Sequence, residues 1–305
     1  MSKDIRDAFF DEVYELAAKD KDVIFISADA DAFSLKRFKK ELPEQFINVG
    51  VAEQNMALVA TGLALAGKKV FIYSITPFIA MRCFEQIKVN ICSMNLPIAI
   101  IGLGSGYSFS YDGPPHHATQ DIAIMRTLPE VTILNPCDEN TSFEAARHCY
   151  NNNGPTYVRI DKGVYQDLYN LPDCTTGFKE ISTKSKVKIL TTGYATHMAL
   201  KIVEELQIDI DVVDIYRLKP LNQDALVELL QESDFIFTLE ENTPIGGLGS
   251  MICELVVDNK INTTVKRLAL EDKQELSFGS REWLISNGGL GNQKIIDTIK
   301  EQLNC

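Results

Sequence analysis

The chain has 305 residues, of which 45% are hydrophobic and 24% charged, a composition typical of a folded globular protein and not of a disordered one. A net charge of −12 argues against a nucleic-acid-binding surface, which needs clustered Lys and Arg, but still allows an anionic substrate in a locally basic pocket. No apolar run is long enough to span a membrane and the N-terminus lacks the apolar run of a signal peptide, so we expect no membrane contact and a cytoplasmic location.

Seven cysteines are scattered along the chain without any Cys-x-x-Cys spacing. A disulfide framework or a zinc cluster needs a denser, paired arrangement. The pattern therefore predicts reduced, structural thiols.

Short β-branched runs alternate with helical patterns through the first half of the chain. This alternation predicts a mostly parallel sheet with helices on both faces. The expected strands are 22–28, 69–75, 96–104, 130–136 and 156–160, and the expected helices are 53–66, 78–94 and 138–150.

The rhythm breaks at 161–186, a polar stretch punctuated by Gly and Pro, and then starts again. We therefore predict two doubly wound α/β domains, residues 1–165 and 187–305, joined by a linker at 166–186. In the second domain we expect strands at 187–193, 209–215, 234–241 and 263–270, and helices at 196–208 and from about 292.

The first candidate site follows a strand that ends at Phe46–Asn48. Gly50 permits a tight turn, and Glu53 then falls in the first turn of a helix, where a carboxylate ordinarily complements the helix dipole. The wider segments "GVAEQNM" and "ATGLALAGKKVFIYS" resemble the pyrimidine-binding domain of the transketolase family of thiamine diphosphate enzymes. The resemblance implies that Glu53 hydrogen-bonds a ring nitrogen of the aminopyrimidine and promotes the imino tautomer that takes the thiazolium proton.

The next segment, "SITPFIAMRCFEQIK", is similar to the part of the family that packs aromatic side chains against the pyrimidine ring. Phe78 aligns with the stacking Phe, while Ile75 and Met81 stand where the family usually has further aromatics. The alternative reading of Phe78 is ordinary core packing.

Two adjacent histidines occur in "YDGPPHHATQD" (111–121), which resembles the family's Asp-Gly-Pro/Ala-Thr-His-Gln stretch. The resemblance implies that Asp112 binds a hydroxyl of the ketose donor, and that His116 holds the donor's oxygens and moves protons. His117 replaces the usual Gln, and we assign it to the substrate side without a defined role. Zinc is the competing interpretation, but adjacent side chains rarely converge on one metal, and no further ligands stand at familiar spacing.

The resemblance continues through "FTLEENTPIGGLGSMICELV", where the glycines are expected to allow close backbone packing, and covers roughly residues 1–300. The family's diphosphate-binding motif, Gly-Asp-Gly followed by Asn, does not occur. We therefore expect no metal ligands in this chain. The resemblance implies a separate N-terminal subunit that binds magnesium and the diphosphate, in a heterotetramer with contacts between like subunits.

Transfer of a two-carbon ketol unit from a ketose to an aldehyde acceptor is the activity that the resemblance favours. Lys162 and Arg6 are candidate contacts to a substrate phosphate, but the donor could equally be an unphosphorylated ketose, a nucleotide-linked sugar or a 2-oxo acid. Alternatives are a deoxyxylulose phosphate synthase-like or 2-oxo acid dehydrogenase β-subunit-like reaction, or a catalytically silent scaffold. Donor, acceptor and pathway stay open.

Overall fold

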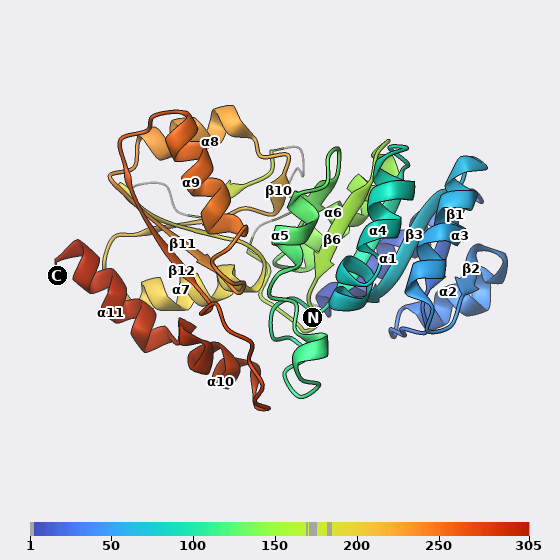
Figure 1. Cartoon of the computed structure of the whole chain (residues 1–305), viewed down its shortest axis with the longest axis horizontal. Coiled ribbons are helices and arrows are strands. Elements are labelled where there is room, and N and C mark those ends of the chain that lie inside the picture. The colour runs from blue at the N-terminus through green and yellow to red at the C-terminus, as the bar shows by residue number, and fades with distance from the viewer. Residues whose placement is uncertain (1–2, 169, 171–175, 182–184, 305) are drawn as a thin grey trace.

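The computed structural model describes residues 3–168, 170, 176–181 and 185–304, which form two α/β lobes (Figure 1). The sheet of the first lobe has the strand order β10-β5-β6-β4-β3-β1-β2. All its pairings are parallel except the antiparallel edge strand β10. The strands are β1 (Val23–Ser27), β2 (Phe46–Asn48), β3 (Lys69–Ile75), β4 (Ile98–Leu103), β5 (Thr132–Leu134), β6 (Thr156–Ile160) and β10 (Arg217–Lys219).

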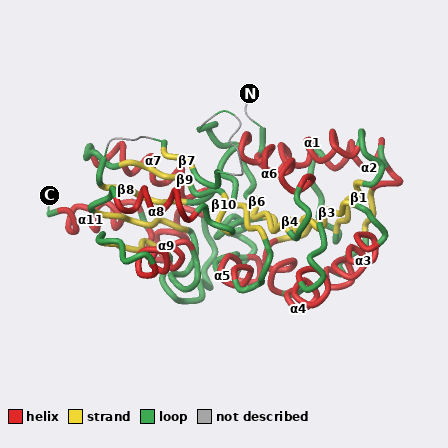
Figure 2. The backbone as a smooth tube through the Cα atoms, turned by 90° about the horizontal axis from the view of Figure 1, so that it is seen from above, coloured by secondary structure: helices red, strands yellow, loops and turns green. Residues whose placement is uncertain are grey.

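Helices cover both faces of this sheet, as the view from above shows (Figure 2). Every residue of β1, β4, β5 and β6 is buried, which explains why these strands read as continuous β-branched runs and not as alternating patterns. One face carries α1 (Ile5–Ala17), α2 (Leu35–Glu41) and α6 (Glu139–Asn151). The other carries α3 (Glu53–Leu65), the helical segment 77–92 and α5 (Asp121–Arg126).

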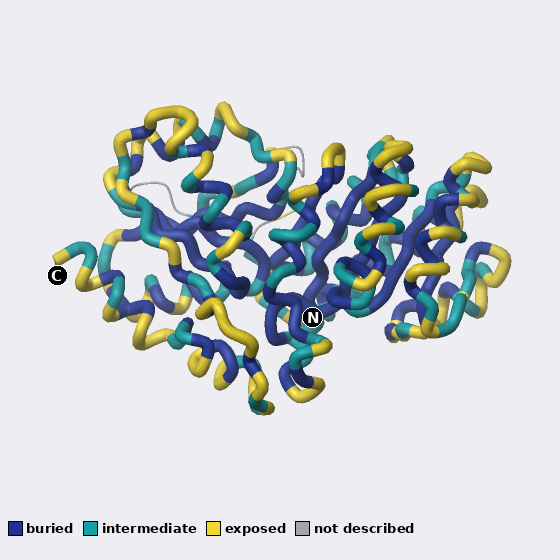
Figure 3. The backbone as a smooth tube through the Cα atoms, in the orientation of Figure 1, coloured by how far each residue is buried: buried dark blue, intermediate teal, exposed yellow. Residues whose placement is uncertain are grey.

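The second lobe is built around a five-stranded sheet of order β12-β11-β8-β9-β7, in which only β7 is antiparallel. Its central strands are buried between helical layers (Figure 3). The strands are β7 (Lys179–Glu180), β8 (Val187–Thr191), β9 (Asp211–Asp214), β11 (Phe235–Glu240) and β12 (Thr264–Ala269). Helices α7 (Tyr194–Leu206), α10 (Arg281–Ile285) and α11 (Asn292–Leu303) pack on one face, and α8 (Gln223–Gln231) and α9 (Leu248–Asp258) on the other.

The predicted fold, two α/β units with mostly parallel sheets, is confirmed. Strands 69–75 and 156–160 have the predicted bounds, and the predicted helix 53–66 ends one residue earlier, at Leu65. The predicted helix 78–94 was wrong in detail, because the segment is two π-helical stretches, Pro77–Met81 and Ile87–Cys92, on either side of α4 (Phe84–Gln86).

Two elements cross the predicted domain limits. Lys179–Glu180, inside the predicted linker, forms β7, and Arg217–Lys219, inside the predicted second domain, adds β10 to the first sheet. Tyr107, from the loop after β4, is buried in the hydrophobic core of the second lobe. The two lobes are therefore joined by shared packing as well as by the chain.

In the part of the chain that the structure describes, no helix combines the length and apolar character needed to cross a membrane. The five described cysteines, 83, 92, 137, 149 and 253, are in the reduced, thiol form, while positions 174 and 305 lie outside the described residues.

Candidate active site

Four of the predicted site residues follow three neighbouring strands at the same edge of the first sheet. β6, β4 and β3 lie side by side and parallel, so their carboxyl ends meet at one edge. Phe78 follows β3, the loop with Asp112 and His116 follows β4, and Lys162 follows β6. Open α/β sheets commonly bind ligands at this edge.

Glu53 is the first residue of α3, but it does not behave as an exposed helix-end charge. Only 3% of its side chain is exposed, and α3 has no side-chain cap at Ala52. Its Oε2 accepts a hydrogen bond from Nη1 of Arg82 at 2.7 Å, and its Oε1 lies 3.4 Å from the donating Oγ of Ser74. The carboxylate is thus fixed inside the protein with one cation on it.

A continuous row of contacts leads away from this carboxylate. The Arg82 guanidinium carbon lies 4.2 Å from the centre of the Phe78 ring, and that ring meets His116 edge-on with 5.0 Å between ring centres. His116 lies 6.0 Å from the ring of Phe109, and Nζ of Lys162 stands 3.9 Å above that ring. We call Glu53, Arg82, Phe78, His116, Phe109 and Lys162 the active-site row.

The loop after β4 directs its two histidines into different surroundings. Nδ1 of His116 lies 3.2 Å from the backbone carbonyl oxygen of Asp112, and the ring is only partly buried. His117 is 4% exposed and meets Tyr107 edge-on at 4.8 Å between ring centres. In the described residues, no group of three His, Cys, Asp or Glu side chains is arranged to hold a metal ion.

His117 has no hydrogen-bond partner on either ring nitrogen among the described residues. Burial lowers the pKa of its imidazole, against the smaller, raising effect of the Glu275 charge. The neutral imidazole is therefore the favoured form in this position. The Asp112 carboxylate, by contrast, is exposed.

Ile75, Met81 and Arg6 stand outside the active-site row. Ile75 ends β3 and Met81 ends the π-helical stretch, and both are partly buried. Arg6 lies in the first turn of α1, with its Nε 3.3 Å from Oδ1 of Asp7. Burial opposes its charge, but Asp7 and its neighbours outweigh burial and raise the Arg6 pKa.

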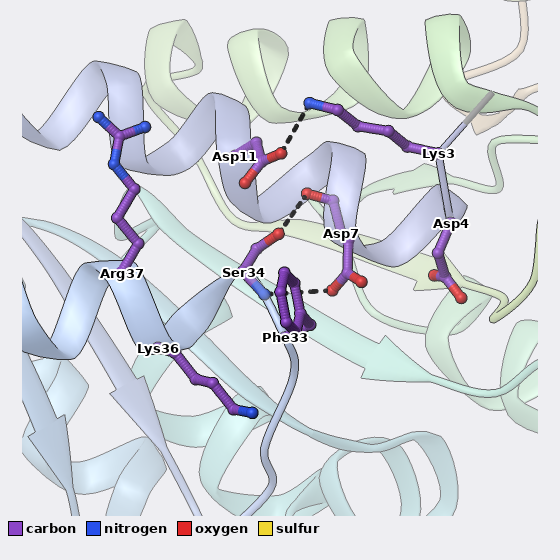
Figure 4. A pocket seen from close by; sticks show the side chains of 8 residues that line it. All are labelled: Lys3, Asp4, Asp7, Asp11, Phe33, Ser34, Lys36 and Arg37. Carbon is purple, nitrogen blue, oxygen red and sulfur yellow. Dashed lines mark hydrogen bonds and ion pairs between the residues drawn. The ribbon is translucent and has the colours of Figure 1, made fainter. Parts of the chain in front are cut away.

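Asp7 and Asp4, the two partners of Arg6, line a hollow of about 380 Å³ between α1 and α2 (Figure 4). Its charges are partly satisfied internally, for Lys3 pairs with Asp11 at 2.8 Å, and Ser34 hydrogen-bonds Asp7. This hollow is lined by residues of α1, α2 and the segments just before them, none of which contributes to the active-site row. The backbone of Ile5 does reach the segment after β6, donating to the Gly163 carbonyl at 2.9 Å.

The second lobe holds the ends of β4 and β6 in place through Arg281. Its Nη2 lies 2.6 Å from Oδ2 of Asp161 and 2.6 Å from Oε2 of Glu241, with 11% of the Arg281 side chain exposed. Burial alone would raise the pKa of Asp161, but Arg281 outweighs it and the pKa is lowered. Asp161 also accepts from Ser105 Oγ at 2.8 Å and from the backbone N–H of Lys162 at 2.8 Å, so the pair orients that lysine.

Glu241 also reaches the β4 loop directly, since its Oε1 accepts from the Tyr107 backbone N–H at 2.9 Å. A Cβ at Gly106 would lie 2.2 Å from the Glu241 carboxyl carbon, and Gly106 has φ of +51°. Only glycine meets both conditions without strain. In the second lobe, a Cβ at Gly247 would lie 2.0 Å from Oε2 of Glu240, so only a glycine lets that side chain pack against the backbone here.

A buried ion pair fixes the far end of the same loop. Nε of Arg159, on β6, lies 2.9 Å from Oδ2 of Asp121, which also accepts from the Tyr157 hydroxyl at 2.7 Å. Arg159 Nη2 donates to the carbonyl of Ala118 at 2.8 Å and to Oδ1 of Asn242 at 3.0 Å. The histidine-bearing loop is thus anchored at both ends.

A hollow of about 650 Å³ opens beside Lys162, between the two lobes. Lys162 and Arg281 line it together with residues of α7. On that side it is walled by Tyr194, His197 and Lys201. Burial lowers the pKa of His197, and its Nε2 lies 2.7 Å from the Cys137 carbonyl oxygen.

Arg82, Arg281, Glu241 and the Asp121–Arg159 pair were not predicted from the sequence. Arginines are mostly exposed, and nothing local marks Arg82 or Arg281 as the partner of a buried carboxylate. Glu241 had a weak signal, for it lies in the "EENTPIGGLG" segment that was singled out for its glycines.

Comparison with known families matches both halves of the chain. The family model described as "Transketolase, pyrimidine binding domain" matches residues 1–167, and "Transketolase, C-terminal domain" matches residues 178–295.

Relatives of similar length include two that are named as subunits. The chain is 30% identical over 303 residues to a subunit of the apulose-4-phosphate transketolase of Phocaeicola vulgatus, covering 97% of this chain and 96% of that protein. It is 32% identical over 304 residues to "6-deoxy-6-sulfo-D-fructose transketolase subunit SqwH" of a Clostridium species, covering 97% and 94%. A 1-deoxy-D-xylulose-5-phosphate synthase of Alkaliphilus oremlandii is 32% identical over 298 residues, but the match covers 47% of that protein.

Among solved structures, "Split gene transketolase, inactive beta4 tetramer" superimposes with a TM-score of 0.87 at 28% identity, covering 100% of this chain and 99% of that one. A transketolase from Leishmania mexicana has a TM-score of 0.79 at 16% identity and shares the fold.

Proposed function

The chain belongs to the transketolase family, and on that premise we propose that it is the catalytic C-terminal subunit of a two-subunit, thiamine diphosphate-dependent transketolase. It would transfer a two-carbon ketol unit from a ketose donor to an aldehyde acceptor. The observation that carries the proposal is the active-site row, which places a buried carboxylate, an aromatic ring and a histidine in sequence at one sheet edge.

The residues around Glu53 suit an aminopyrimidine. A planar group with N–H donors, the Arg82 guanidinium, already lies against Phe78 and hydrogen-bonds Glu53, which is the combination of contacts that the pyrimidine would need. In this proposal Glu53 shares one proton with a pyrimidine ring nitrogen in a hydrogen bond, and Phe78 supports the ring. When bound, thiamine diphosphate supplies the nucleophilic carbon that receives the two-carbon unit. Ile75 and Met81 would give only apolar contact.

His116 and Asp112 are proposed to act on the donor. If Nδ1–H of His116 donates to the Asp112 carbonyl, 3.2 Å away, Nε2 is left as an acceptor for a donor hydroxyl proton. The exposed Asp112 carboxylate can accept a hydrogen bond from a second donor hydroxyl. His117 is excluded from direct proton transfer by its burial, and would shape the loop from behind.

Lys162 is the proposed contact for an anionic group on the substrate. Its ammonium group lies at the end of the active-site row and beside the 650 Å³ hollow, and a lysine neutralises a phosphate as a point charge. Arg6, which is committed to Asp7, is a weaker candidate. We therefore place ketose phosphates first among the donors to be tested.

A separate subunit is proposed to bind magnesium and the diphosphate. Three relatives of similar length carry the word "subunit" in their names, and the split-gene transketolase of similar structure is described as an inactive tetramer of β chains. Three apolar side chains near Glu53 are exposed: Val51, just before α3, is 74% exposed, and Leu58 and Leu65, on α3, are 49% and 63% exposed. Contacts between subunits, including like subunits, are expected on this surface.

The test is to isolate the chain with its stoichiometric partner and to titrate thiamine diphosphate and magnesium into the chain alone and into the complex. Binding is expected only in the complex, together with ketol transfer from a ketose phosphate. Glu53→Gln should lower turnover by about 100-fold or more, the usual cost of losing a general acid–base group, with Glu85→Gln as the exposed control. Full turnover in Glu53→Gln would favour the scaffold alternative, and turnover with pyruvate in place of a ketose would favour the synthase-like one.

A further inference from the structure

Arg82 pairs with the buried Glu53 carboxylate, and nothing in the neighbouring sequence indicates this contact. It follows the π-helical stretch Pro77–Met81, and its backbone N–H donates to the Pro77 carbonyl at 3.2 Å, a five-residue spacing. Its carbonyl accepts from the Gln54 side chain at 3.2 Å, which ties it to α3. π-Helical turns are often found at functional sites because they redirect one side chain. Here that side chain is aimed at Glu53.

The guanidinium makes two contacts at once. It hydrogen-bonds the Glu53 carboxylate at 2.7 Å and covers the Phe78 ring at 4.2 Å. The Glu53 side chain is 3% exposed and its Oε1 lies 3.4 Å from the Ser74 hydroxyl, while the 44% exposed Arg82 side chain holds its Oε2. A ligand ring that needs Glu53 can reach it only if Arg82 moves away.

Arg82 is able to move, in contrast to the arginines of the buried pairs. Its side chain is 44% exposed, so rotation carries the guanidinium into solvent without opening the core, while its backbone stays anchored to Pro77 and Gln54. The Arg159 and Arg281 side chains, at 3% and 11% exposure, have no such path.

We propose that Arg82 is a placeholder for the cofactor's aminopyrimidine: in the cofactor-free protein it neutralises Glu53 and covers Phe78, and it is displaced when the cofactor binds. This rests on the proposed function. The placeholder stabilises the cofactor-free state, because a buried carboxylate without a partner is costly. It also weakens the apparent cofactor affinity, because the cofactor can bind only to the fraction of molecules in which Arg82 has left the site.

The test compares the wild-type complex with Arg82→Ala by calorimetric titration of thiamine diphosphate at fixed magnesium. We expect cofactor binding about tenfold tighter in Arg82→Ala, the factor that corresponds to one hydrogen bond to a charged group. The melting temperature of the cofactor-free complex should fall, while that of the saturated complex should not, since the two effects are one thermodynamic cycle. Lys88→Ala, which removes an exposed cation from the neighbouring helical stretch, should change neither.

Weaker or unchanged cofactor binding in Arg82→Ala would overturn the placeholder, because Arg82 would then contact the bound cofactor or have no effect on it. Arg82→Gln, which keeps a planar donor without charge, should give an intermediate affinity and guards against a misfolded Ala variant. Failure of the wild-type complex to bind thiamine diphosphate would instead overturn the proposed function itself.

Discussion

Replacing Arg281 should destabilise the fold strongly. It lies between Asp161 and Glu241, both at 2.6 Å, and the exposed fractions of the three side chains are 11%, 3% and 2%. Replacing Arg281 by Met leaves two buried carboxylates facing one another without a cation. Removing one partner of a buried ion pair typically costs about 3–5 kcal/mol, and we expect a loss of unfolding free energy in that range.

The assay is urea denaturation at pH 7 followed by circular dichroism, with Lys186→Met as the control. Lys186 and its partner Asp234 are both 73% exposed, so that change should cost less than about 1 kcal/mol. Arg281→Met combined with Glu241→Gln should recover part of the loss, because one of the two buried charges is gone. The reasoning would be refuted if Arg281→Met lowered the unfolding free energy by less than about 1 kcal/mol, or if the double variant were less stable than Arg281→Met alone.

The Arg281 pair also predicts a pH dependence with a definite sign. The native pKa of Asp161 is lowered, so its contribution to stability is present above the unfolded value, about 3.9, and is lost as pH falls through the native one. In Arg281→Met, burial without the cation would raise the native pKa of Asp161, and the variant would regain stability on acidification. The difference between wild type and variant should therefore be smaller at pH 4 than at pH 7.

Two further predictions concern the active-site loop and the substrate. Burial lowers the pKa of His117, so below about pH 6.5 the unfolded chain binds a proton that the native chain does not, and the unfolding free energy falls as the pH falls. In urea titrations, His117→Gln should make this fall shallower between about pH 7 and 5.5. An unaltered pH dependence would contradict a neutral His117 in the native protein. Lys162→Met in the complex should raise KM for a ketose phosphate by about tenfold with little change in kcat, and leave KM for an unphosphorylated ketose unchanged. An equal rise for both donors would remove Lys162 from the phosphate role.

Regular elements were predictable where local pattern and tertiary burial agree. The runs 69–75 and 156–160 are β-branched and lie in the middle of the sheet, buried on both faces, so pattern and structure coincide. β10 is three residues long and pairs with β5, a strand more than 80 positions earlier, so only the folded chain specifies it. The π-helical stretches around α4 escaped prediction because each is only about one turn long, 5 and 6 residues, within a segment of helical pattern.

The site shows the same division between what is local and what is not. Glu53, Phe78 and His116 were identified from segments that each carry a recognisable motif, Lys162 was a candidate phosphate contact, and the structure brings the four into one row. Phe78 is not plain core packing, for it is partly exposed between Arg82 and His116. Arg82 and Arg281 carry no motif, because what distinguishes them is a buried carboxylate contributed by a distant part of the chain.

These two arginines illustrate how burial decides whether an ion pair holds a structure or can be exchanged. Arg281 is enclosed with two carboxylates, so releasing it would leave two uncompensated charges, and the pair can only fix the loops that carry Tyr107 and Lys162. Arg82 meets one carboxylate and keeps 44% of its side chain in solvent, so a ligand that replaces its single hydrogen bond and its ring contact releases it at little cost. If the melting temperature of the cofactor-free complex dropped as much in Arg82→Ala as in Arg281→Met, this distinction would be wrong.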